Sequence, residues 1–360
     1  MTLILKIDPI NPEKELIIAA AKVIKEGGTV VFPTETVYGL GANGLDSEAC
    51  KRIFEIKGRP RDNPLILHIS GINSLYNLTV DTDRRLLDFA KKVWPGPITM
   101  LFKADPKVPR IVTAGLPTVA IRCPANKIAL SLIEESGTPI AAPSANISTK
   151  PSTTRLKHIL QDLDGKVDMI IDGGQTTFGV ESTIIDMTTT PPRLLRPGAL
   201  TVDEIEKHIG NIIVPKTINQ KLIDNETAIA PGMKYKHYAP DKRLVLVTNK
   251  DLFAEAAVVA KERQEKIAIL CSSQTAKELR ESTDLQNITL IILGNGDNLY
   301  EIASNLFDAF RTLDDTKAKL GFIQGFDERG IGLTIMNRIL KATGNSVAKD
   351  PDDIADAIIM

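Results

Sequence analysis

Three cations lie within five residues at Lys57, Arg59 and Arg61, in a segment that two prolines keep from forming a helix. Pro60 and Pro64 fix their own φ at about −65° and push the residues before them toward extended backbone. Two guanidinium groups and one ammonium together offer fork-shaped and point-like donors, which suit a polyphosphate better than a single carboxylate. A solvated basic loop is the ordinary alternative, so other residues of the chain must decide whether this segment binds an anion.

Two further segments place polar side chains beside apolar stretches. Ser144 and Asn146 follow a short apolar run and offer donors and acceptors next to main-chain N–H groups. The glycine-bearing residues 173–179 lead to Ser182 at the start of another apolar run, and Arg196 adds a cation before a turn. Each of these is an ordinary turn or surface feature when taken alone. Together with the basic segment they are candidates for surrounding one anion.

Several familiar site patterns are incomplete. Residues 39–44 match G-x-G-x-x-G, but the polar residues 33–36 separate them from an apolar run, and Asp62, the acid about 20 residues on, lies in the basic segment. We therefore expect these glycines to form turns and not a dinucleotide site. The sequence has no P-loop, no G-x-S-x-G and no paired histidines, and His68, alone on a strand, fits a core residue as well as a catalyst. The sequence predicts neither a zinc site nor a covalent enzyme intermediate.

The scaffold that must position these residues is predicted to be an α/β domain ending near residue 209. Its first helix begins at Asn11-Pro12 and stops at Gly27-Gly28, and strands and helices alternate after it. The expected strands are 29–32, 65–69, 98–102, 119–122, 140–142, 169–171 and 183–187, and the further helices are 46–56, 83–93, 127–136 and 155–160.

A second domain follows a linker. Residues 212–242 lose amphipathic order, and a loop this long is usually a linker or a functional lid. Beyond it, expected strands at 244–247, 267–271 and 288–293 alternate with helices at 252–263, 274–280 and 299–312, and a last helix begins near 330. This order predicts a small, mostly parallel sheet of Rossmann-like or flavodoxin-like type. The predicted boundaries are 1–210, 211–242 and 243–360.

The composition limits the classes of function. A chain of 360 residues is long enough for two domains, and its net charge of −1 gives no general attraction to nucleic acid or anionic membrane. The three cysteines lack C-x-x-C spacing and are expected to be packing residues in a reducing compartment. No apolar run is long enough to span a bilayer, so we expect a cytoplasmic protein.

Read in order, six motifs resemble the YrdC-like family. They are FPTETVYGL at 32–40, KGRP at 57–60, NPL at 63–65, WPGP at 94–97, RCP at 122–124 and PSAN at 143–146. The K-x-R and S-x-N signatures of that family stand here as Lys57/Arg59 and Ser144/Asn146, and the likeness covers roughly residues 10–210. The segment 231–240 and the added C-terminal domain are similar to the long, two-domain threonylcarbamoyl-AMP synthases of the family.

The resemblance implies a fold and a reaction. The fold is a domain with a twisted mixed sheet and a concave cavity, joined to the smaller C-terminal α/β domain. The reaction is a nucleotidyl transfer in which L-threonine, bicarbonate and ATP with Mg²⁺ give threonylcarbamoyl-AMP and pyrophosphate, without an organic prosthetic group. The product would pass to a tRNA threonylcarbamoyltransferase that modifies the adenosine beside the anticodon.

The resemblance also implies roles for individual residues. Lys57 and Arg59 would stabilise charge during catalysis, and no protein side chain would bind a metal. The linker residue Tyr235 would reach the nucleotide only if the linker folds back, so we expect a lid that excludes water from a hydrolysable intermediate. ATP would be bound by Arg59, Asn63, Thr118, Ser144, Asn146, Ser152, Arg196 and Tyr235, and threonine by Thr36, His68, Arg122, the main chain at Ala142, and Ser182.

Two other functions stay open at this point. An RNA-binding module of the same fold would use a basic concave surface, although the near-neutral charge and the lack of aromatic side chains among the cations disfavour more than a weak RNA contact. A carbamoyl-adenylate-forming enzyme is the other alternative, but it would be expected to carry acylphosphatase-like and zinc-finger segments that the sequence does not show.

Overall fold

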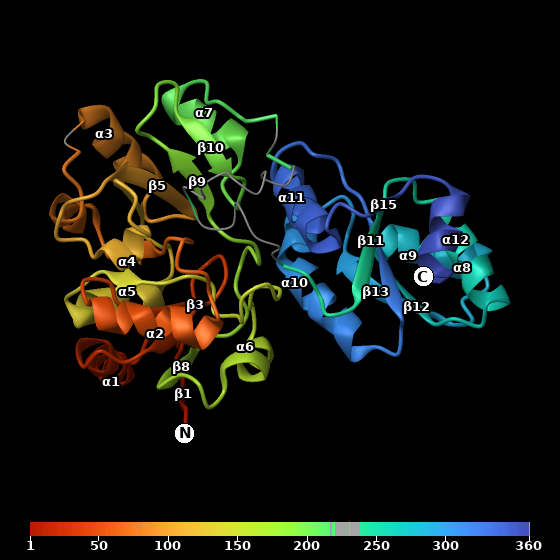
Figure 1. Ribbon diagram of the computed structural model, residues 1–360, viewed down its shortest axis with the longest axis horizontal. Coiled ribbons are helices and arrows are strands. Elements are labelled where there is room, and N and C mark those ends of the chain that lie inside the picture. Colours follow the sequence, from red (N-terminus) through yellow and green to blue (C-terminus); the bar gives the residue numbers. More distant parts are fainter. Residues whose placement is uncertain (82, 217, 220–229, 231–237, 360) are drawn as a thin grey trace. The chain divides into compact units, whose positions relative to one another are not determined.

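The computed structural model describes the chain except for residues 82, 217, 220–229, 231–237 and 360. It divides into two compact units, the first made of Met1–Ser148 and Ser152–Tyr235 and the second of Thr149–Pro151 and Lys236–Met360 (Figure 1). No described helix has both the length and the apolar character needed to cross a membrane.

The first unit is built on a ten-stranded sheet with the order β1-β8-β2-β3-β7-β4-β6-β5-β9-β10. The sheet contains parallel pairs such as β4 with β6 and antiparallel pairs such as β5 with β6, so it is mixed, as expected. The strands are β1 Leu3–Lys6, β2 Val30–Phe32, β3 Gly39–Asn43, β4 Ile66–His68, β5 Ile98–Lys103, β6 Thr118–Arg122, β7 Ile140–Ala141, β8 Met169–Asp172, β9 Thr183–Asp186 and β10 Arg193–Arg196.

Amphipathic helices cover this sheet. The apolar faces of α1 and α5 share one core with side chains of β2, β7 and β8, which explains why both helices show a helical apolar period. The helices are α1 Lys14–Lys25, α2 Ser47–Lys57, α3 Arg84–Val93, α4 Arg110–Thr113, α5 Lys127–Ser136, α6 Leu156–Leu163 and α7 Val202–Ile209, with a 3₁₀ helix at Ile72–Asn77.

The prediction that residues 39–44 form turns is wrong, because most of them form strand β3. β3 pairs antiparallel with β2 and β7 and lies inside the sheet. The glycines serve close packing: a Cβ on Gly41 would lie 2.7 Å from both the Phe32 ring and the Ile140 side chain. Glycine is therefore needed here because neighbouring side chains cross the backbone closely.

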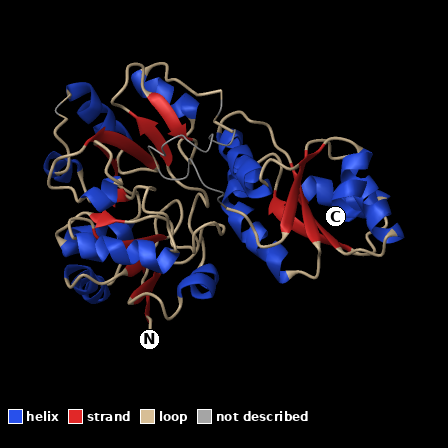
Figure 2. Ribbon diagram, viewed as in Figure 1, coloured by secondary structure: helices blue, strands red, loops and turns tan. Residues whose placement is uncertain are grey.

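The second unit is an α/β fold with a five-stranded parallel sheet of order β13-β12-β14-β11-β15, as the sequence predicts. Helices flank the strands on both faces (Figure 2), and α8, α9 and α12 share one apolar core with β11, β12 and β14. The elements are β11 Arg243–Val247, α8 Leu252–Glu262, β12 Ile267–Ser272, α9 Ser273–Ser282, β13 Ile288–Gly294, α10 Leu299–Asp315, β14 Leu320–Gln324, α11 Ile331–Thr343, β15 Val347–Ala348 and α12 Pro351–Ile359.

Candidate functional site

The basic segment begins where α2 ends. Asp46 caps the start of this helix by accepting from the N–H groups of Glu48 and Ala49, and Gly58, with φ of 60°, ends it directly after Lys57. The carbonyl of Lys57 then accepts from the N–H of Ser148 at 2.9 Å. The helix end is thus fixed to the loop that follows the S-x-N signature.

The side chain of Lys57 joins the two signatures directly. It is only 2% exposed, and its Nζ donates hydrogen bonds to the main-chain carbonyl oxygens of Ser144 and Asn146. The Asn146 side chain donates from Nδ2 to the carbonyl of Ile147 at 2.8 Å. An ammonium buried against two carbonyl oxygens holds the S-x-N turn in one conformation.

Arg59 closes the basic segment on itself. Its Nε donates to the carbonyl of Asn63 at 3.1 Å, and its Nη2 donates to Asn63 Oδ1 at 2.6 Å and to the carbonyl of Pro64 at 2.8 Å. Asn63 is buried, whereas Arg61 on the same segment is exposed. Arg59 is therefore held in place by its own loop, whereas Arg61 extends into solvent.

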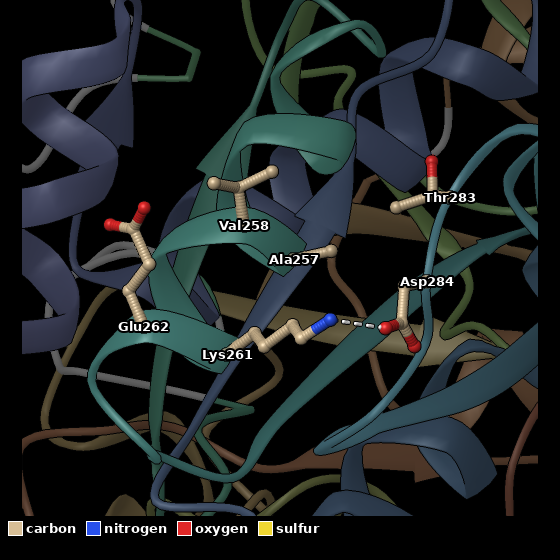
Figure 3. Close-up of a pocket in the computed structure, with 6 residues that line it drawn as sticks. All are labelled: Ala257, Val258, Lys261, Glu262, Thr283 and Asp284. Atoms are coloured by element: carbon tan, nitrogen blue, oxygen red, sulfur yellow. Dashed lines mark hydrogen bonds and ion pairs between the residues drawn. The ribbon is translucent and has the colours of Figure 1, made fainter.

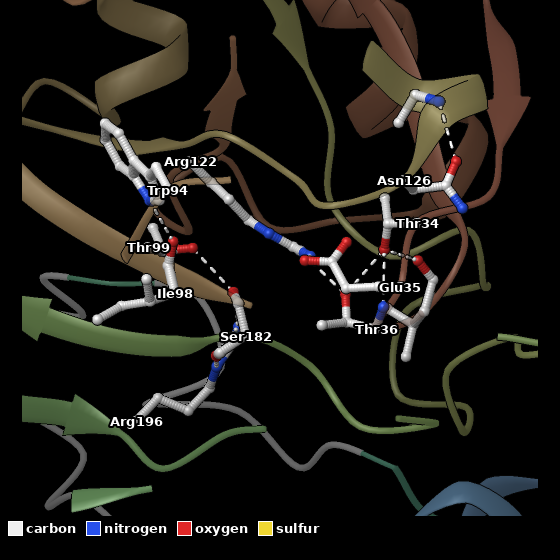
Figure 4. A network of polar contacts seen from close by, with 12 residues as sticks. Thr34, Glu35, Thr36, Trp94, Ile98, Thr99, Arg122, Asn126, Ser182 and Arg196 are labelled. Atoms are coloured by element: carbon white, nitrogen blue, oxygen red, sulfur yellow. Dashed lines mark hydrogen bonds and ion pairs between the residues drawn. The ribbon is translucent and has the colours of Figure 1, made fainter. Parts of the chain in front are cut away.

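A second polar cluster surrounds Arg122 at the end of β6 (Figure 4). Its Nη1 donates to Thr36 Oγ1 at 2.9 Å, and its Nη2 lies 2.7 Å from Glu35 Oε1. Thr36 Oγ1 lies 2.8 Å from Thr34 Oγ1, which in turn donates to the carbonyl of Val37 at 2.7 Å. The side chains of both Glu35 and Arg122 are buried, so this ion pair lies away from bulk solvent.

His68 adjoins this cluster through the sheet. It is the register partner of Arg122 on β6, and its ring lies edge-on to Phe32 with centroids 6.0 Å apart. Burial, together with the nearby charge of Arg122, lowers the pKa of His68 to about 3. The imidazole is therefore neutral near pH 7 and presents a polar but uncharged edge.

A third cluster connects two residues that the resemblance assigns to different ligands. Arg196 donates from Nε and Nη2 to the carbonyl oxygen of Ser182, at 3.2 and 2.9 Å, and from Nη2 to its hydroxyl at 3.2 Å. The Ser182 hydroxyl also lies 2.8 Å from that of Thr99 on β5. The guanidinium expected at the nucleotide is thus hydrogen-bonded to a hydroxyl expected at threonine (Figure 4).

The remaining predicted residues differ in what the structure shows of them. Ser152 donates a 2.5 Å hydrogen bond to Glu181 Oε1, and both are buried. Ala142 donates its N–H to the carbonyl of Ile66, so a main-chain contact to a ligand would use its carbonyl oxygen. Thr118 stands half-buried at the start of β6, four residues from Arg122 and therefore on the same face of the strand. Tyr235 lies outside the described residues.

Four residues of these clusters were not predicted as site residues from the sequence. Thr34, Glu35, Thr99 and Glu181 each contact a predicted residue, and all four are buried. A signal existed for Glu35, because an acid inside an otherwise uncharged and largely apolar motif requires a buried partner. The contacts of Thr99 and Glu181 depend on how distant segments meet, and no local pattern announces them.

The three cysteines are buried and free, which confirms that they are packing residues. Burial raises the pKa of each thiol, and for Cys123, where the Glu35 carboxylate adds to this effect, the value is about 11. Such thiols remain protonated near pH 7 and are poor nucleophiles.

The second unit has a pocket of about 490 Å³ on its surface (Figure 3). Lys261 Nζ donates to Asp284 Oδ2 at 2.6 Å within it, so these two charges neutralise each other. The lining is therefore less suited to an anion than the clusters of the first unit. The lining residues are Ala257, Val258, Lys261, Glu262, Thr283 and Asp284.

Comparisons with known proteins cover both units. A family model described as telomere recombination, for Sua5, YciO and YrdC proteins, matches residues 22–198, and one described as threonylcarbamoyl-AMP synthase, C-terminal domain, matches 200–344. A threonylcarbamoyl-AMP synthase of Pyrococcus abyssi is 46% identical over 97% of this chain and 100% of that protein. One of Bacillus subtilis is 42% identical over 95% of this chain and 97% of that protein.

Two solved structures are also similar to this chain. The crystal structure of P. abyssi Sua5 complexed with L-threonine matches 97% of this chain and 100% of that chain, with a TM-score of 0.89 and 46% identity. The structure of E. coli YciO covers 55% of this chain and 97% of that chain, with a TM-score of 0.51 and 28% identity. The likeness to the first of these therefore extends over nearly the whole chain.

Proposed function

The chain belongs to the threonylcarbamoyl-AMP synthase family, and from this membership we propose that it converts L-threonine, bicarbonate and ATP to threonylcarbamoyl-AMP and pyrophosphate. The observation that carries the proposal is the pair of Lys57 hydrogen bonds that join the K-x-R and S-x-N signatures. They bring a cationic segment and a polar turn together without a P-loop. The relative complexed with L-threonine supports the choice of amino acid.

The nucleotide side of the site uses cations whose positions are set by main-chain oxygens. Arg59 is anchored by the carbonyls of Asn63 and Pro64, and Arg196 by the carbonyl of Ser182. Guanidinium groups held in this way face developing phosphate charge without reorganising during the reaction. We assign ATP to these two cations together with Asn63, Thr118, Ser144, Asn146, Ser152 and Tyr235.

The threonine side centres on Arg122, whose planar guanidinium suits the carboxylate of the amino acid. Thr34 uses its hydroxyl proton on the carbonyl of Val37, so the 2.8 Å contact makes Thr36 the donor to Thr34. Thr36 also accepts from Arg122, and one acceptor position on its oxygen is left for a substrate donor. Ser182, neutral His68 and the carbonyl of Ala142 complete the threonine side.

The chemical step requires two anions to meet. The threonine amino group and bicarbonate form an N–C bond and release water, which gives a carbamate. A carbamate oxygen then attacks the α-phosphorus of ATP, forming an O–P bond while the bond to the leaving pyrophosphate oxygen breaks. Mg²⁺ enters as the complex with ATP. Within the described residues, no group of three or more His, Cys, Asp or Glu side chains is placed to bind a metal. The protein supplies orientation and positive charge.

The linker completes the site in this proposal. Ala230 is fully buried against Ile66, Leu101, Ala120, Ile184 and Leu195, which include side chains from β4, β5 and β6. Ala120 lies between Thr118 and Arg122 on one strand face, so this part of the linker passes over the face that bears both. A linker held there supports its role as a lid that keeps water from the carbamate and the adenylate.

The product is an activated group, so a tRNA threonylcarbamoyltransferase must consume it, and both steps would occur in the cytoplasm. Pyrophosphate release with ATP, bicarbonate and each amino acid in turn tests the proposal. Release should depend on threonine and fall at least tenfold in Arg59→Ala, while Arg61→Ala, an exposed arginine two residues away, should stay near wild type. Equal release with serine, valine or no amino acid would refute the threonine assignment.

A further inference from the structure

Glu35 and Arg122 form an ion pair whose hydrogen bonds are incomplete. Glu35 is 6% exposed and Arg122 is 4% exposed, with Glu35 Oε1 and Arg122 Nη2 at 2.7 Å. Among the described residues, none donates a well-formed hydrogen bond to either carboxylate oxygen of Glu35, and none accepts one from Nε or Nη2 of Arg122. Buried charges in this condition are costly unless a further partner completes their hydrogen bonds.

The orientation of Arg122 identifies the edge whose hydrogen bonds are incomplete. Nη1 donates to Thr36, whose hydroxyl is itself fixed by Thr34. The opposite edge, made of Nε and Nη2, is one that can bind a carboxylate with two parallel hydrogen bonds. Glu35 stands beside this edge, and its main chain is fixed because its carbonyl accepts from the N–H of Phe178 at 2.9 Å. A donor edge and two acceptor oxygens therefore lie side by side.

An α-amino acid zwitterion matches this arrangement. Its carboxylate carries acceptors and its ammonium carries three donors, and only three covalent bonds separate the ammonium nitrogen from a carboxylate oxygen. We propose that Glu35 binds the α-ammonium of threonine while Arg122 binds its carboxylate, so that Glu35 selects for an amino acid over other hydroxy acids. The proposal rests on the proposed function and adds a specificity residue to it.

The neighbouring groups leave Glu35 as the acceptor that would meet a positive charge. Arg122 lies against it, the adjacent His68 is neutral, and the Cys123 thiol remains protonated. Among these neighbours the carboxylate is the only negative charge that an ammonium would meet. Thr36, at Nη1 of the same guanidinium, adds one acceptor position that could take a hydrogen bond from the threonine hydroxyl.

Two other roles for Glu35 predict different results. As a counterion only, it would hold Arg122 in place and affect every ligand with a carboxylate equally. If the substrate must instead displace Glu35 from Arg122, Glu35 would compete with the substrate carboxylate, and removing its charge would raise the affinity for both ligands. Binding of two ligands that differ only at the amino group separates these roles from the proposed one.

The experiment measures calorimetric binding of L-threonine and of 2,3-dihydroxybutanoate, which replaces the ammonium by a hydroxyl, to the full chain. Wild type should prefer threonine, and Glu35→Gln should weaken threonine binding about 10- to 100-fold while changing the analogue far less. Glu35→Asp keeps the charge but places it one methylene further back, so its affinity for threonine should lie between those of wild type and Glu35→Gln. Glu134→Gln, a change at an exposed glutamate on α5, is the matched control.

Each other outcome is decisive. Equal losses for both ligands in Glu35→Gln would assign Glu35 to Arg122 alone, and a gain in affinity would assign it as a displaced occupant; either result overturns the proposal. If Glu35→Gln does not fold, as judged by its thermal transition, an unchanged ligand preference in Glu35→Asp overturns it. A wild-type protein that binds neither ligand would instead refute the proposed function, which keeps the two failures distinct.

Discussion

The buried imidazole of His68 makes stability dependent on pH in a calculable way. Its pKa falls from the ordinary 6.5 to about 3 in the folded chain, because burial and Arg122 disfavour the charged form. Below the unfolded value the unfolded state binds the proton and the folded state does not, so stability falls as pH falls from 6.5 toward 3. Each pH unit in this window costs about 1.4 kcal/mol, and the step from about pH 6.5 to pH 5 costs about 2 kcal/mol.

The assay compares urea unfolding of wild type and His68→Gln at about pH 8 and pH 5. The sequence contains one tryptophan, Trp94, which is buried in the first unit and donates to the carbonyl of Ile98 at 2.9 Å, so its fluorescence follows the unit that contains His68. Removing the imidazole should lessen the acid-induced loss of unfolding free energy by about 2 kcal/mol. The exposed His208→Gln variant should retain the wild-type loss.

Equal acid-induced losses in wild type and His68→Gln would refute this reasoning. They would mean that His68 takes up a proton in the folded chain, and that its environment is less apolar than the packing against Phe32 indicates. An imidazole that stays neutral from about pH 5 upward should give no ionisation in the pH profile of pyrophosphate release, so in our proposal His68 acts through shape and hydrogen bonding.

Two further predictions concern the joined signatures and the linker. Lys57→Met removes an ammonium that donates to the carbonyls of Ser144 and Asn146. We expect the unfolding free energy in urea to fall by about 3 kcal/mol and the KM for ATP in pyrophosphate release to rise. A variant as stable as wild type would show that these bonds do not hold the turn. Deleting residues 230–240 removes the buried Ala230 and should abolish synthesis or raise threonine-independent ATP hydrolysis; unchanged kinetics would contradict the lid.

The sequence predicted elements where the local chemistry is self-contained. Asp46 caps α2 as its type and place before an apolar period suggest, and strands β11, β12 and β13 of the second unit follow its apolar runs. The predictions from sequence were wrong where the conformation of a residue depends on a neighbour that is distant in the chain. Gly41 was expected in a turn because its sequence resembles one, but the crossing of Phe32 and Ile140 over the backbone decides its conformation. Strands β1, β10, β14 and β15 were also not predicted, and β15 has only two residues.

The same limit applies to the site. The signatures identify Lys57 and Ser144 as site residues. They do not show that Lys57 donates to the carbonyl of Ser144, because the two residues come from separate turns. Glu35 carried a local signal as a lone acid in a motif of buried residues, yet only the fold shows that its partner is Arg122. Residue types can be assigned from a motif, whereas their pairing requires the sheet that brings β3, β4, β6 and β7 together.

Three cations of the candidate site donate hydrogen bonds to main-chain carbonyl oxygens, which in our proposal takes the place of a P-loop. Lys57 donates to two main-chain carbonyls, Arg59 to those of Asn63 and Pro64, and Arg196 to that of Ser182. A carbonyl oxygen holds the direction of such a cation. In the proposed reaction these charges are therefore oriented before ATP arrives, and little reorganisation remains for the transition state. Arg122 lies beside the Glu35 carboxylate, and our proposal places it at the zwitterion of threonine.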